Sequence, residues 1–315
     1  MNILFDGNYL VHKCYSVFQT YYRGKDMTEV LGDPENRQVL LRKCIIDMCY
    51  TIKRFRRVHR VAFVFDSSSW RYSLYKDYKY ALTRVRDAAY PLFLECLDEF
   101  ADFLKKKGVI VSRVQGAEGD DLLYMWSMYF GFCRGEKVVI ITGDSDIRQV
   151  ITEEVALFNN NSHNLKLYCL ESRRQYWEDY FDSDIEVVSV VPFEVLLGKV
   201  ILGDTSDNIP KIKRGFGEKA MQKFISELQP YTEPRNVDIV QMAQWISGRF
   251  AQAVHMPDDA VFKQVYSNLK LVWLNLAVYD EALIERMLDS VNENAESYKY
   301  KGEYTLESFY GMLIK

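Results

Sequence analysis

Acidic side chains stand directly after several short apolar runs of the sequence. Asp6 lies in LFDGN, Asp66 in FVFDSS, and Asp144 with Asp146 in ITGDSD. Each run is typical of a buried strand, and the carboxyl ends of parallel strands converge on one crevice of a doubly wound sheet. Two more acidic segments, GAEGDDLL and ILGDTSDNIP, extend the set. Its nine members are Asp6, Asp66, Glu118, Asp120, Asp121, Asp144, Asp146, Asp204 and Asp207.

A single aspartate after a strand has an ordinary structural explanation, because it can cap the next helix. Helix capping does not explain the whole set, because two carboxylates about 4 Å apart repel by roughly 4 kcal/mol at an effective dielectric constant of about 20. Oxygen ligands without nearby cysteine or histidine suit Mg²⁺ or Mn²⁺. Two such ions, roughly 3.5 to 4 Å apart, could activate a water and stabilise the leaving oxygen of a phosphodiester. The predicted chemistry is phosphoryl-ester hydrolysis.

The apolar pattern predicts the elements that must position these carboxylates. Buried strands are expected at residues 2–5, 61–65, 109–113 and 137–142, with helices at 41–55, 94–107 and 120–130 between them. This alternation predicts an α/β fold with a doubly wound, mainly parallel sheet over residues 1–190. Residues 191–315 are expected to form a C-terminal helical region, with helices at 237–253 and 261–274. Residues 23–37 read as a surface loop.

Composition excludes several classes of protein. The 315 residues are 48% hydrophobic and carry a net charge of −4, but basic residues gather at 53–60, 71–86, 105–107 and 211–214. The six cysteines form no CxxC pair, which argues against a zinc site or a disulfide framework. No apolar run approaches the roughly 18 to 20 residues of a membrane helix, and the N-terminus lacks a signal-peptide pattern. A cytoplasmic protein without a membrane partner is expected.

Five segments in this order resemble a known family: LFDGN, VAFVFDSSSWRYSLYKDYK, GAEGDDLL, ITGDSDIRQV and GDTSDNIPKIKRGFGEKA. The chain resembles the 5′-nucleases, which include flap endonucleases, the exonuclease domain of bacterial DNA polymerase I, and phage RNase H. The resemblance covers residues 1–224 and implies a PIN/5′-nuclease-like fold. It implies 5′-3′ exonuclease and flap endonuclease activity that removes RNA primers or 5′ flaps during replication.

The resemblance also implies cofactors and partners. Asp6, Asp66 and Asp120 would bind one metal ion with Glu118 nearby, and Asp144 and Asp146 the second, supported by Asp121, Asp204 and Asp207. Two Mg²⁺ ions are expected, with Mn²⁺ able to substitute. The substrates would be DNA and RNA-DNA hybrids with a 5′ single-stranded end or flap, bound by a monomer, with replication proteins as further partners. A chain without a fused polymerase is more like the phage enzymes, so a phage source is expected.

In this family the segment after the second strand forms a helical arch, here residues 67–90. It interleaves basic side chains with tyrosines and Trp70, which suits a single strand because aromatic rings can stack on unpaired bases. By resemblance, Lys79 in the Tyr78-Lys79 pair contacts the scissile phosphate, and Arg71 lies two helical turns earlier. Leu82 replaces the family's frequent arginine, which leaves Arg84 and Arg86 as candidates for its role. The alternative is a tyrosine-rich surface helix.

Residues 196–226 resemble the family's helix-three-turn-helix, in which a glycine-rich hairpin grips the duplex backbone. Gly215 and Gly217 would let the chain approach phosphates. Lys211, Lys213, Arg214 and Lys219 would add charge. Compared with the common pattern, the hairpin is one residue longer and lacks the usual threonine after Lys219, so a K⁺ site is left open. An ordinary glycine-containing helix connection is the alternative.

Two other functions share part of this pattern. A PIN-type endoribonuclease has an acidic crevice on a similar sheet, but it would not need the GDTSDNIP segment and the glycine-rich hairpin. A non-catalytic module that recognises branched DNA could keep the basic segments. Activity in Mg²⁺ against activity in EDTA would separate the module from an enzyme.

Overall fold

The computed structural model describes residues 1–79, 88–161, 165–181, 184–228 and 237–297. Contacts divide the chain into two compact units. The first unit comprises the described residues of Met1–Ser68, Val85–Val190 and Glu285–Lys315, and the second those of Ser69–Arg84 and Val191–Ile284. Among these residues, no helix combines the length and apolar character that crossing a membrane requires.

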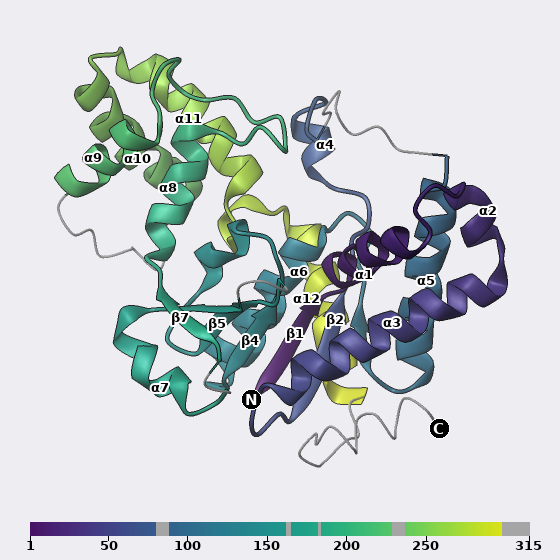
Figure 1. Cartoon of the computed structure of the whole chain (residues 1–315). Coiled ribbons are helices and arrows are strands. Elements are labelled where there is room, and N and C mark those ends of the chain that lie inside the picture. Colours follow the sequence, from purple (N-terminus) through teal and green to yellow (C-terminus); the bar gives the residue numbers. More distant parts are fainter. Residues whose placement is uncertain (80–87, 162–164, 182–183, 229–236, 298–315) are drawn as a thin grey trace. The chain divides into compact units, whose positions relative to one another are not determined.

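A seven-stranded sheet forms the centre of the first unit (Figure 1), with the order β3-β2-β1-β4-β5-β6-β7. β1 to β5 run parallel, β6 pairs antiparallel with β5, and β7 pairs parallel with β6. The predicted doubly wound, mainly parallel sheet is therefore confirmed. The strands are β1 (Asn2–Asp6), β2 (Arg60–Val64), β3 (Ile110–Ser112), β4 (Val138–Ile141), β5 (Val155–Asn159), β6 (Lys166–Cys169) and β7 (Glu186–Ser189).

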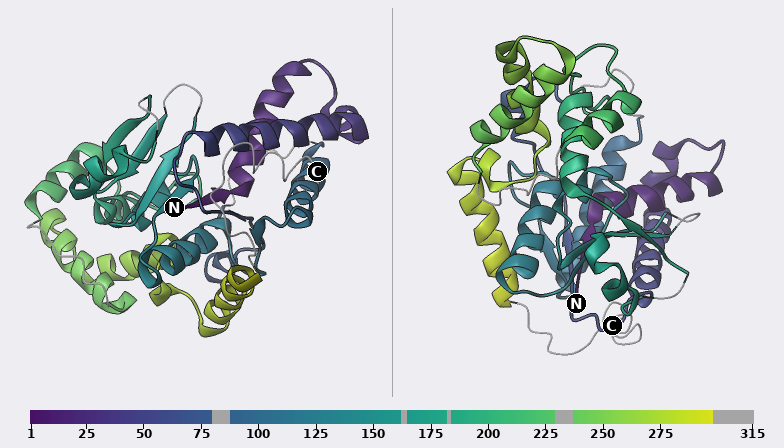
Figure 2. Two further views of the ribbon diagram at one scale, coloured as in Figure 1. Left: turned by 90° about the horizontal axis from the view of Figure 1, so that it is seen from below. Right: turned by 90° about the vertical axis from the view of Figure 1, so that its left-hand side faces the viewer.

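Helices cover both faces of this sheet, as the turned views of Figure 2 show. One face carries α1 (Gly7–Tyr21), α3 (Pro34–Lys53) and α5 (Tyr90–Lys106). The other carries α6 (Gly119–Ser127) and most of α12 (Glu281–Ser297), where Ser290 lies 2.9 Å from Ser112 of β3. Smaller elements complete the unit: α2 (Met27–Gly32), α7 (Arg174–Glu178), the π-helix η1 (Met128–Cys133) and the 3₁₀ helices η2 (Asp146–Val150) and η3 (Glu171–Arg173).

Burial on both faces explains why the strands are continuous apolar runs. Ile3, Leu4 and Phe5 of β1 are fully buried although neighbouring side chains point to opposite faces. Phe5 stacks on Phe63 of β2 with ring centroids 4.7 Å apart. The central strands are thereby fixed in register, and so are the residues that follow them.

The prediction of a surface loop at residues 23–37 is wrong. α2 forms within it, and α3 begins at Pro34, earlier than the predicted helix. Asp26 caps α2 by accepting a hydrogen bond from the Thr28 backbone N–H, and Asp33 caps α3 through that of Glu35. Proline at the first helical position fits because it needs no partner for an N–H.

The second unit is helical. It contains α4 (Arg71–Leu74), α8 (Pro192–Leu202), α9 (Glu218–Glu227), α10 (Ile239–Val254), α11 (Asp258–Val272), the 3₁₀ helix η4 (Leu276–Val278) and the start of α12. Phe250 of α10 packs edge-on against Phe216 and Phe224, which secures α9 and the segment before it. Asn268 of α11 donates to the carbonyls of Val200 and Pro210, which fastens the end of α8 and the following loop.

The prediction of a continuous helix from Arg71 to Lys79 is also wrong. α4 ends after Leu74, Tyr75 is extended, and Lys79 has a left-handed backbone with a φ of 53°. Lys79 is held there by its backbone N–H, which donates to the carbonyl of Asp207 at 2.9 Å. Tertiary hydrogen bonds thus replace helical ones in this segment. Arg84 and Arg86 lie outside the described residues.

Candidate active site

The carboxyl ends of β1 and β4 lie side by side where the strand order reverses, which is where ligands bind in open α/β sheets. Asp6 ends β1 and caps α1: its Oδ1 accepts from the Tyr9 backbone N–H at 2.9 Å. Its Oδ2 accepts from the Thr142 hydroxyl at 2.9 Å. Thr142 directly follows β4 and is fully buried. One threonine thus ties the two strand ends together.

Thr142 also fixes the acidic segment that follows. Its hydroxyl accepts from the Asp144 backbone N–H at 3.1 Å, and Asp144 Oδ1 accepts from the Asp146 backbone N–H at 2.8 Å. Asp146 begins the short 3₁₀ helix η2. A chain of hydrogen bonds therefore connects Asp6, Asp144 and Asp146 across two strands.

Asp66 follows β2 and joins this edge of the sheet from the other side of β1. Its Oδ1 accepts from the Gly119 backbone N–H at 2.6 Å, at the start of α6. Its own N–H donates to Asn8 Oδ1 at 2.9 Å. A Cβ at Gly119 would lie 3.0 Å from that Asp66 oxygen, so glycine is what permits the close approach.

The acidic residues of α6 divide into two kinds. Glu118 and Asp121 are buried and form a capping box, in which each side chain accepts the other residue's backbone N–H. For this pair the structural explanation of an acidic helix start is observed. Asp120 lies between them in the first turn, is half-buried, and follows the glycine that contacts Asp66.

Burial and crowded carboxylates together determine the electrostatics of Asp6 at this edge. Burial, together with the neighbouring charges of Asp66 and Asp144, raises the pKa of Asp6 to about 7, although hydrogen bonds from Tyr9 and Thr142 act to lower it. A raised carboxyl pKa means that the ionised form is disfavoured unless a cation is present. The expected repulsion between carboxylates therefore acts on Asp6, from Asp66 and Asp144.

This edge, here called the carboxylate edge, comprises Asp6, Asp66, Asp120, Asp144 and Asp146. Its donors are carboxylate oxygens, the type that hard divalent cations prefer. No three histidine, cysteine or carboxylate side chains within the described ranges are placed closely enough to form a ready ligand set. The donor chemistry fits a divalent cation, and hydrogen bonds fix the side chains of Asp6, Asp66 and Asp144.

Asp204 and Asp207 belong to the second unit, where both have partners within the fold. Asp204 pairs with Lys199 and accepts from the backbone N–H and hydroxyl of Ser206. Partial burial alone would raise the pKa of Asp204, but these contacts lower it. Asp207 accepts a hydrogen bond from the Tyr78 hydroxyl at 3.4 Å. Gly203 has a φ of 68°, and a Cβ there would lie 2.3 Å from the Ile209 carbonyl oxygen, so this tight loop requires glycine.

Two predicted arch residues also have structural roles. Arg71 is only 2% exposed, its Nε donates to the Leu271 carbonyl at 2.8 Å, and its guanidinium lies 4.9 Å from the Trp70 ring centroid. These contacts fasten α4 to α11 rather than present Arg71 at the surface. Tyr78 is buried, and the Lys79 ammonium lies 5.2 Å from its ring centroid.

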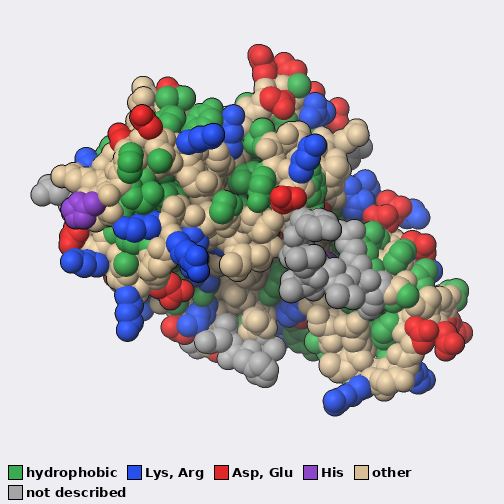
Figure 3. Space-filling model, turned by 90° about the horizontal axis from the view of Figure 1, so that it is seen from above, with side chains coloured by type: hydrophobic (Ala, Val, Ile, Leu, Met, Phe, Trp, Pro, Cys, Tyr) green, Lys and Arg blue, Asp and Glu red, His purple; other side chains and the backbone are tan. Residues whose placement is uncertain are grey.

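Basic residues surround the hairpin between α8 and α9. Lys211, Arg214 and Lys219 are exposed, whereas Lys213 donates to the Val254 carbonyl at 2.9 Å and so supports the end of α10. Gly215 has a left-handed φ of 81°, and Gly217 is extended just before α9. Figure 3 shows Lys and Arg side chains scattered over the face that it draws, with Asp and Glu side chains between them.

The residues that orient the carboxylates were not predicted from the sequence. Thr142 and Asn8 make the hydrogen bonds that join strand ends, yet neither was a candidate. Both stand inside the acidic segments, in ITGD and LFDGN. Polar residues beside an aspartate at a strand end were the available signal.

The N-terminal part of the chain matches a known protein family. The family of the 5′-3′ exonuclease N-terminal resolvase-like domain matches residues 1–178. The match covers more than half of the chain, and the protein belongs to this family.

Individual relatives are distant. The 5′-3′ exonuclease of Mycoplasmopsis pulmonis is 24% identical over 98% of this chain and 93% of its own length. The 5′-3′ exonuclease of Buchnera aphidicola from Acyrthosiphon pisum is 26% identical over 63% of this chain, and the chain spans only 63% of that relative's length. Among solved structures, the bacteriophage T5 D15 flap endonuclease in complex with DNA and metal ions matches with a TM-score of 0.57 at 18% identity, covering 94% of this chain and 99% of the phage protein.

Proposed function

We propose that this protein is a structure-specific 5′-nuclease that hydrolyses phosphodiesters near the 5′ ends of strands in or beside a duplex. The observation that carries the proposal is the carboxylate edge, where hydrogen bonds hold Asp6, Asp144 and Asp146 in one connected set at the reversal of strand order. Membership of the 5′-3′ exonuclease family supports it.

The carboxylate edge would hold divalent cations, two Mg²⁺ ions with Mn²⁺ as a substitute. When bound, such ions supply a nucleophilic water and stabilise charge on the phosphate oxygens. The chain's own part is to fix the ligands: Thr142 orients Asp6 and the Asp144 segment, and the Gly119 N–H orients Asp66. A bound cation would favour the ionised form of Asp6 by offsetting the burial and the repulsion that raise its pKa.

Lys79 is our candidate for the residue that offsets charge on the scissile phosphate. Its backbone is fixed by Asp207, and the Asn208 amide donates to the Asp77 carbonyl, so the segment before residue 80 has a defined course. Arg71 is no longer favoured for this role, because its buried guanidinium already bonds within the fold.

The second unit would bind the duplex backbone through the hairpin between α8 and α9. Lys211, Arg214 and Lys219 are the exposed cations there, and the amides around Gly215 could approach phosphate oxygens. We propose DNA and RNA-DNA hybrids with a free 5′ end or flap as substrates, consistent with removal of primers or flaps in replication. The hairpin is also where a K⁺ ion would belong.

The test uses two 5′-labelled substrates, a DNA flap and an RNA-primed duplex, each incubated with the full chain in Mg²⁺, in Mn²⁺ and in EDTA. We expect metal-dependent products cut near the junction or shortened from the 5′ end. Product lengths would distinguish endonucleolytic from exonucleolytic cleavage, and the two substrates would rank DNA against RNA. Binding without cleavage in every metal would instead identify a branched-DNA-binding module.

A further inference from the structure

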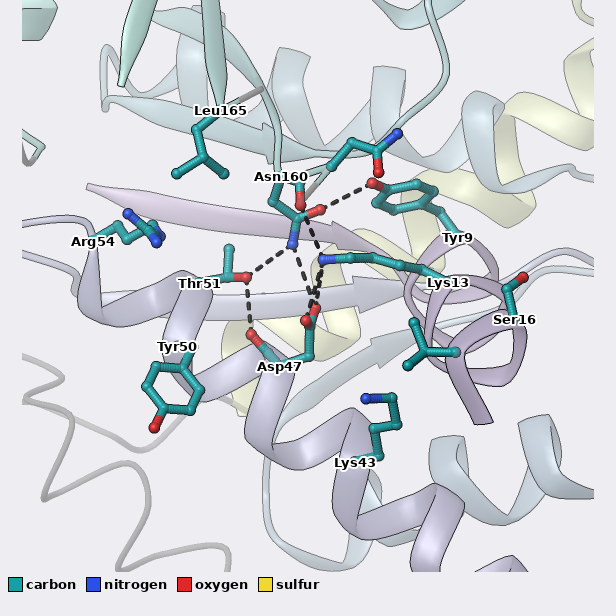
Figure 4. Close-up of a pocket in the computed structure, with 12 residues that line it drawn as sticks. Tyr9, Lys13, Ser16, Lys43, Asp47, Tyr50, Thr51, Arg54, Asn160 and Leu165 are labelled. Atoms are coloured by element: carbon teal, nitrogen blue, oxygen red, sulfur yellow. Dashed lines mark hydrogen bonds and ion pairs between the residues drawn. The ribbon is translucent and has the colours of Figure 1, made fainter. Parts of the chain in front are cut away.

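A polar pocket of about 630 Å³ lies in the first unit, between α1, α3 and the end of β5 (Figure 4). Tyr9 and Lys13 reach it from α1, Asp47 and Thr51 from α3, and Asn160 from the residue after β5. These side chains point toward one another and are joined by hydrogen bonds. None of them belongs to the carboxylate edge.

Asn160 is the centre of this network and is only 5% exposed. Its Nδ2 donates to Thr51 Oγ1 at 2.9 Å, and its carbonyl accepts from Lys13 Nζ at 3.0 Å. Lys13 in turn pairs with Asp47 at 2.9 Å. The side-chain oxygen of Asn160, Oδ1, accepts from the Tyr9 hydroxyl at 3.0 Å. This partly buried network of hydrogen bonds holds its members in one geometry.

Tyr9 connects this network to the carboxylate edge at two points. Its backbone N–H donates to Asp6 Oδ1 at 2.9 Å. Its ring packs against Gly143, where a Cβ would lie only 2.4 Å from Tyr9 Cε2. Gly143 joins Thr142 to Asp144, so the ring presses on the turn that sets the direction of Asp144 and Asp146.

We propose that Tyr9 is a positioning residue, clamped through its hydroxyl by Asn160 so that its ring holds the Gly143 turn and with it the metal-binding carboxylates. This inference rests on the proposed function. Tyr9 touches neither substrate nor metal in this role and acts through the ligands it orients. Residues that orient metal ligands typically change metal affinity or activity by about 10 to 100-fold when altered.

The experiment compares Tyr9, in α1, with Tyr22, which directly follows α1. Both tyrosine hydroxyls donate a hydrogen bond to the side-chain oxygen of an asparagine. Tyr9→Phe removes only the hydroxyl that donates a hydrogen bond to Asn160 Oδ1. Tyr22→Phe is the matched control, because the half-buried Tyr22 donates to Asn36 Oδ1 at 2.7 Å, away from the carboxylate edge. Both variants keep the ring, and thermal unfolding would show that both fold.

Two readouts separate positioning from mere stability. Mn²⁺ binding is measured by electron paramagnetic resonance without substrate, and single-turnover flap cleavage is measured over a series of Mg²⁺ concentrations. We expect Tyr9→Phe to weaken Mn²⁺ binding about tenfold and to raise the Mg²⁺ concentration for half-maximal rate by a similar factor. Excess Mg²⁺ should restore most of the rate, whereas Tyr22→Phe should stay within about twofold of wild type.

The outcomes are distinguishable. If both variants bind Mn²⁺ as the wild type does, or both lose affinity equally, the positioning role is overturned while cleavage by the wild type leaves the proposed function intact. A wild type that binds Mn²⁺ but cleaves no substrate would refute the proposed function, and the Mn²⁺ affinities would still decide the role of Tyr9.

Discussion

The carboxylate edge and the hairpin between α8 and α9 handle charge in opposite ways. At the edge, like charges are brought together and fixed by specific hydrogen bonds from Thr142, Gly119 and neighbouring backbone groups. At the hairpin, Lys211, Arg214 and Lys219 extend into solvent without such fixing, and glycines shape the backbone. Hydrogen bonds set the geometry of the carboxylate edge although its charges repel, whereas the hairpin would attract phosphates through several exposed side chains.

This difference predicts different responses to mutation. At the carboxylate edge one substitution should remove activity and still relieve strain, since function and stability oppose each other there. At the hairpin single substitutions should have small effects that add together, because each phosphate contact acts nearly independently.

Asp146→Asn should have the largest effect on activity. We expect single-turnover flap cleavage to fall by at least about 10³-fold, or about 4 kcal/mol, because a proposed metal ligand is lost. The melting temperature without metal should be equal or higher, since fewer carboxylates repel one another. Asp98→Asn is the control, because it removes an exposed ion pair with Arg113 elsewhere in the same unit. Turnover of Asp146→Asn near the wild-type value would refute its assignment as a metal ligand.

Lys79→Ala should slow the chemical step by roughly 10², or about 2.7 kcal/mol, with little change in substrate affinity. The ammonium is expected to offset charge on the scissile phosphate, and alanine keeps the backbone hydrogen bond to Asp207. Lys76→Ala, an exposed lysine three residues earlier, is the control. Single-turnover cleavage with enzyme in excess measures the effect, and a rate within about threefold of wild type would make Lys79 a bystander.

The raised pKa of Asp6 predicts a pH-dependent stability. Its folded pKa of about 7 lies above the ordinary value of 3.8, so its stabilising contribution is complete below about pH 4 and is lost as the pH rises to about 7. Without metal, Asp6→Asn should therefore match wild type near pH 4 and exceed it near pH 8. Because the Asp6 side chain is only half-buried, we expect a difference of about 2 kcal/mol.

Denaturant unfolding at several pH values measures this difference, and added Mg²⁺ should restore wild-type stability at high pH. A pH-independent difference between the two proteins would show that Asp6 is not subject to the repulsion described above.

The hairpin should give the smallest change for each residue. Replacing Lys211, Arg214 and Lys219 with alanine should reduce the slope of log affinity against log salt on duplex DNA by about 2.7, about 0.9 for each contact. Lys213 is left in place because it supports the end of α10. Lys223→Ala serves as a control, since Lys223 pairs with Glu227 on α9. An unchanged slope for the triple variant would locate the duplex site elsewhere.

The two regions also differ in how far the sequence predicted them. Asp6, Asp66 and Asp144 follow runs of consecutive apolar residues, which predict strands buried on both faces. The parallel direction of these strands was enough to predict that the three aspartates lie at one edge of the sheet. The continuous helix expected to carry Arg71 and Lys79 does not form, because the backbone N–H of Lys79 donates to the carbonyl of Asp207, over 120 positions away in the chain. Helical periodicity contains no information about such a partner.

The sequence by itself determined the sheet, the order of the acidic segments and the chemical type of the site, since these depend on local polarity pattern and residue identity. Tertiary structure decided the tasks of individual side chains. Glu118 and Asp121 close a capping box, Arg71 fastens α4 to α11, and Thr142 joins β1 to β4. The reason is physical: a hydrogen bond requires atoms about 3 Å apart, and only the folded chain brings those atoms together.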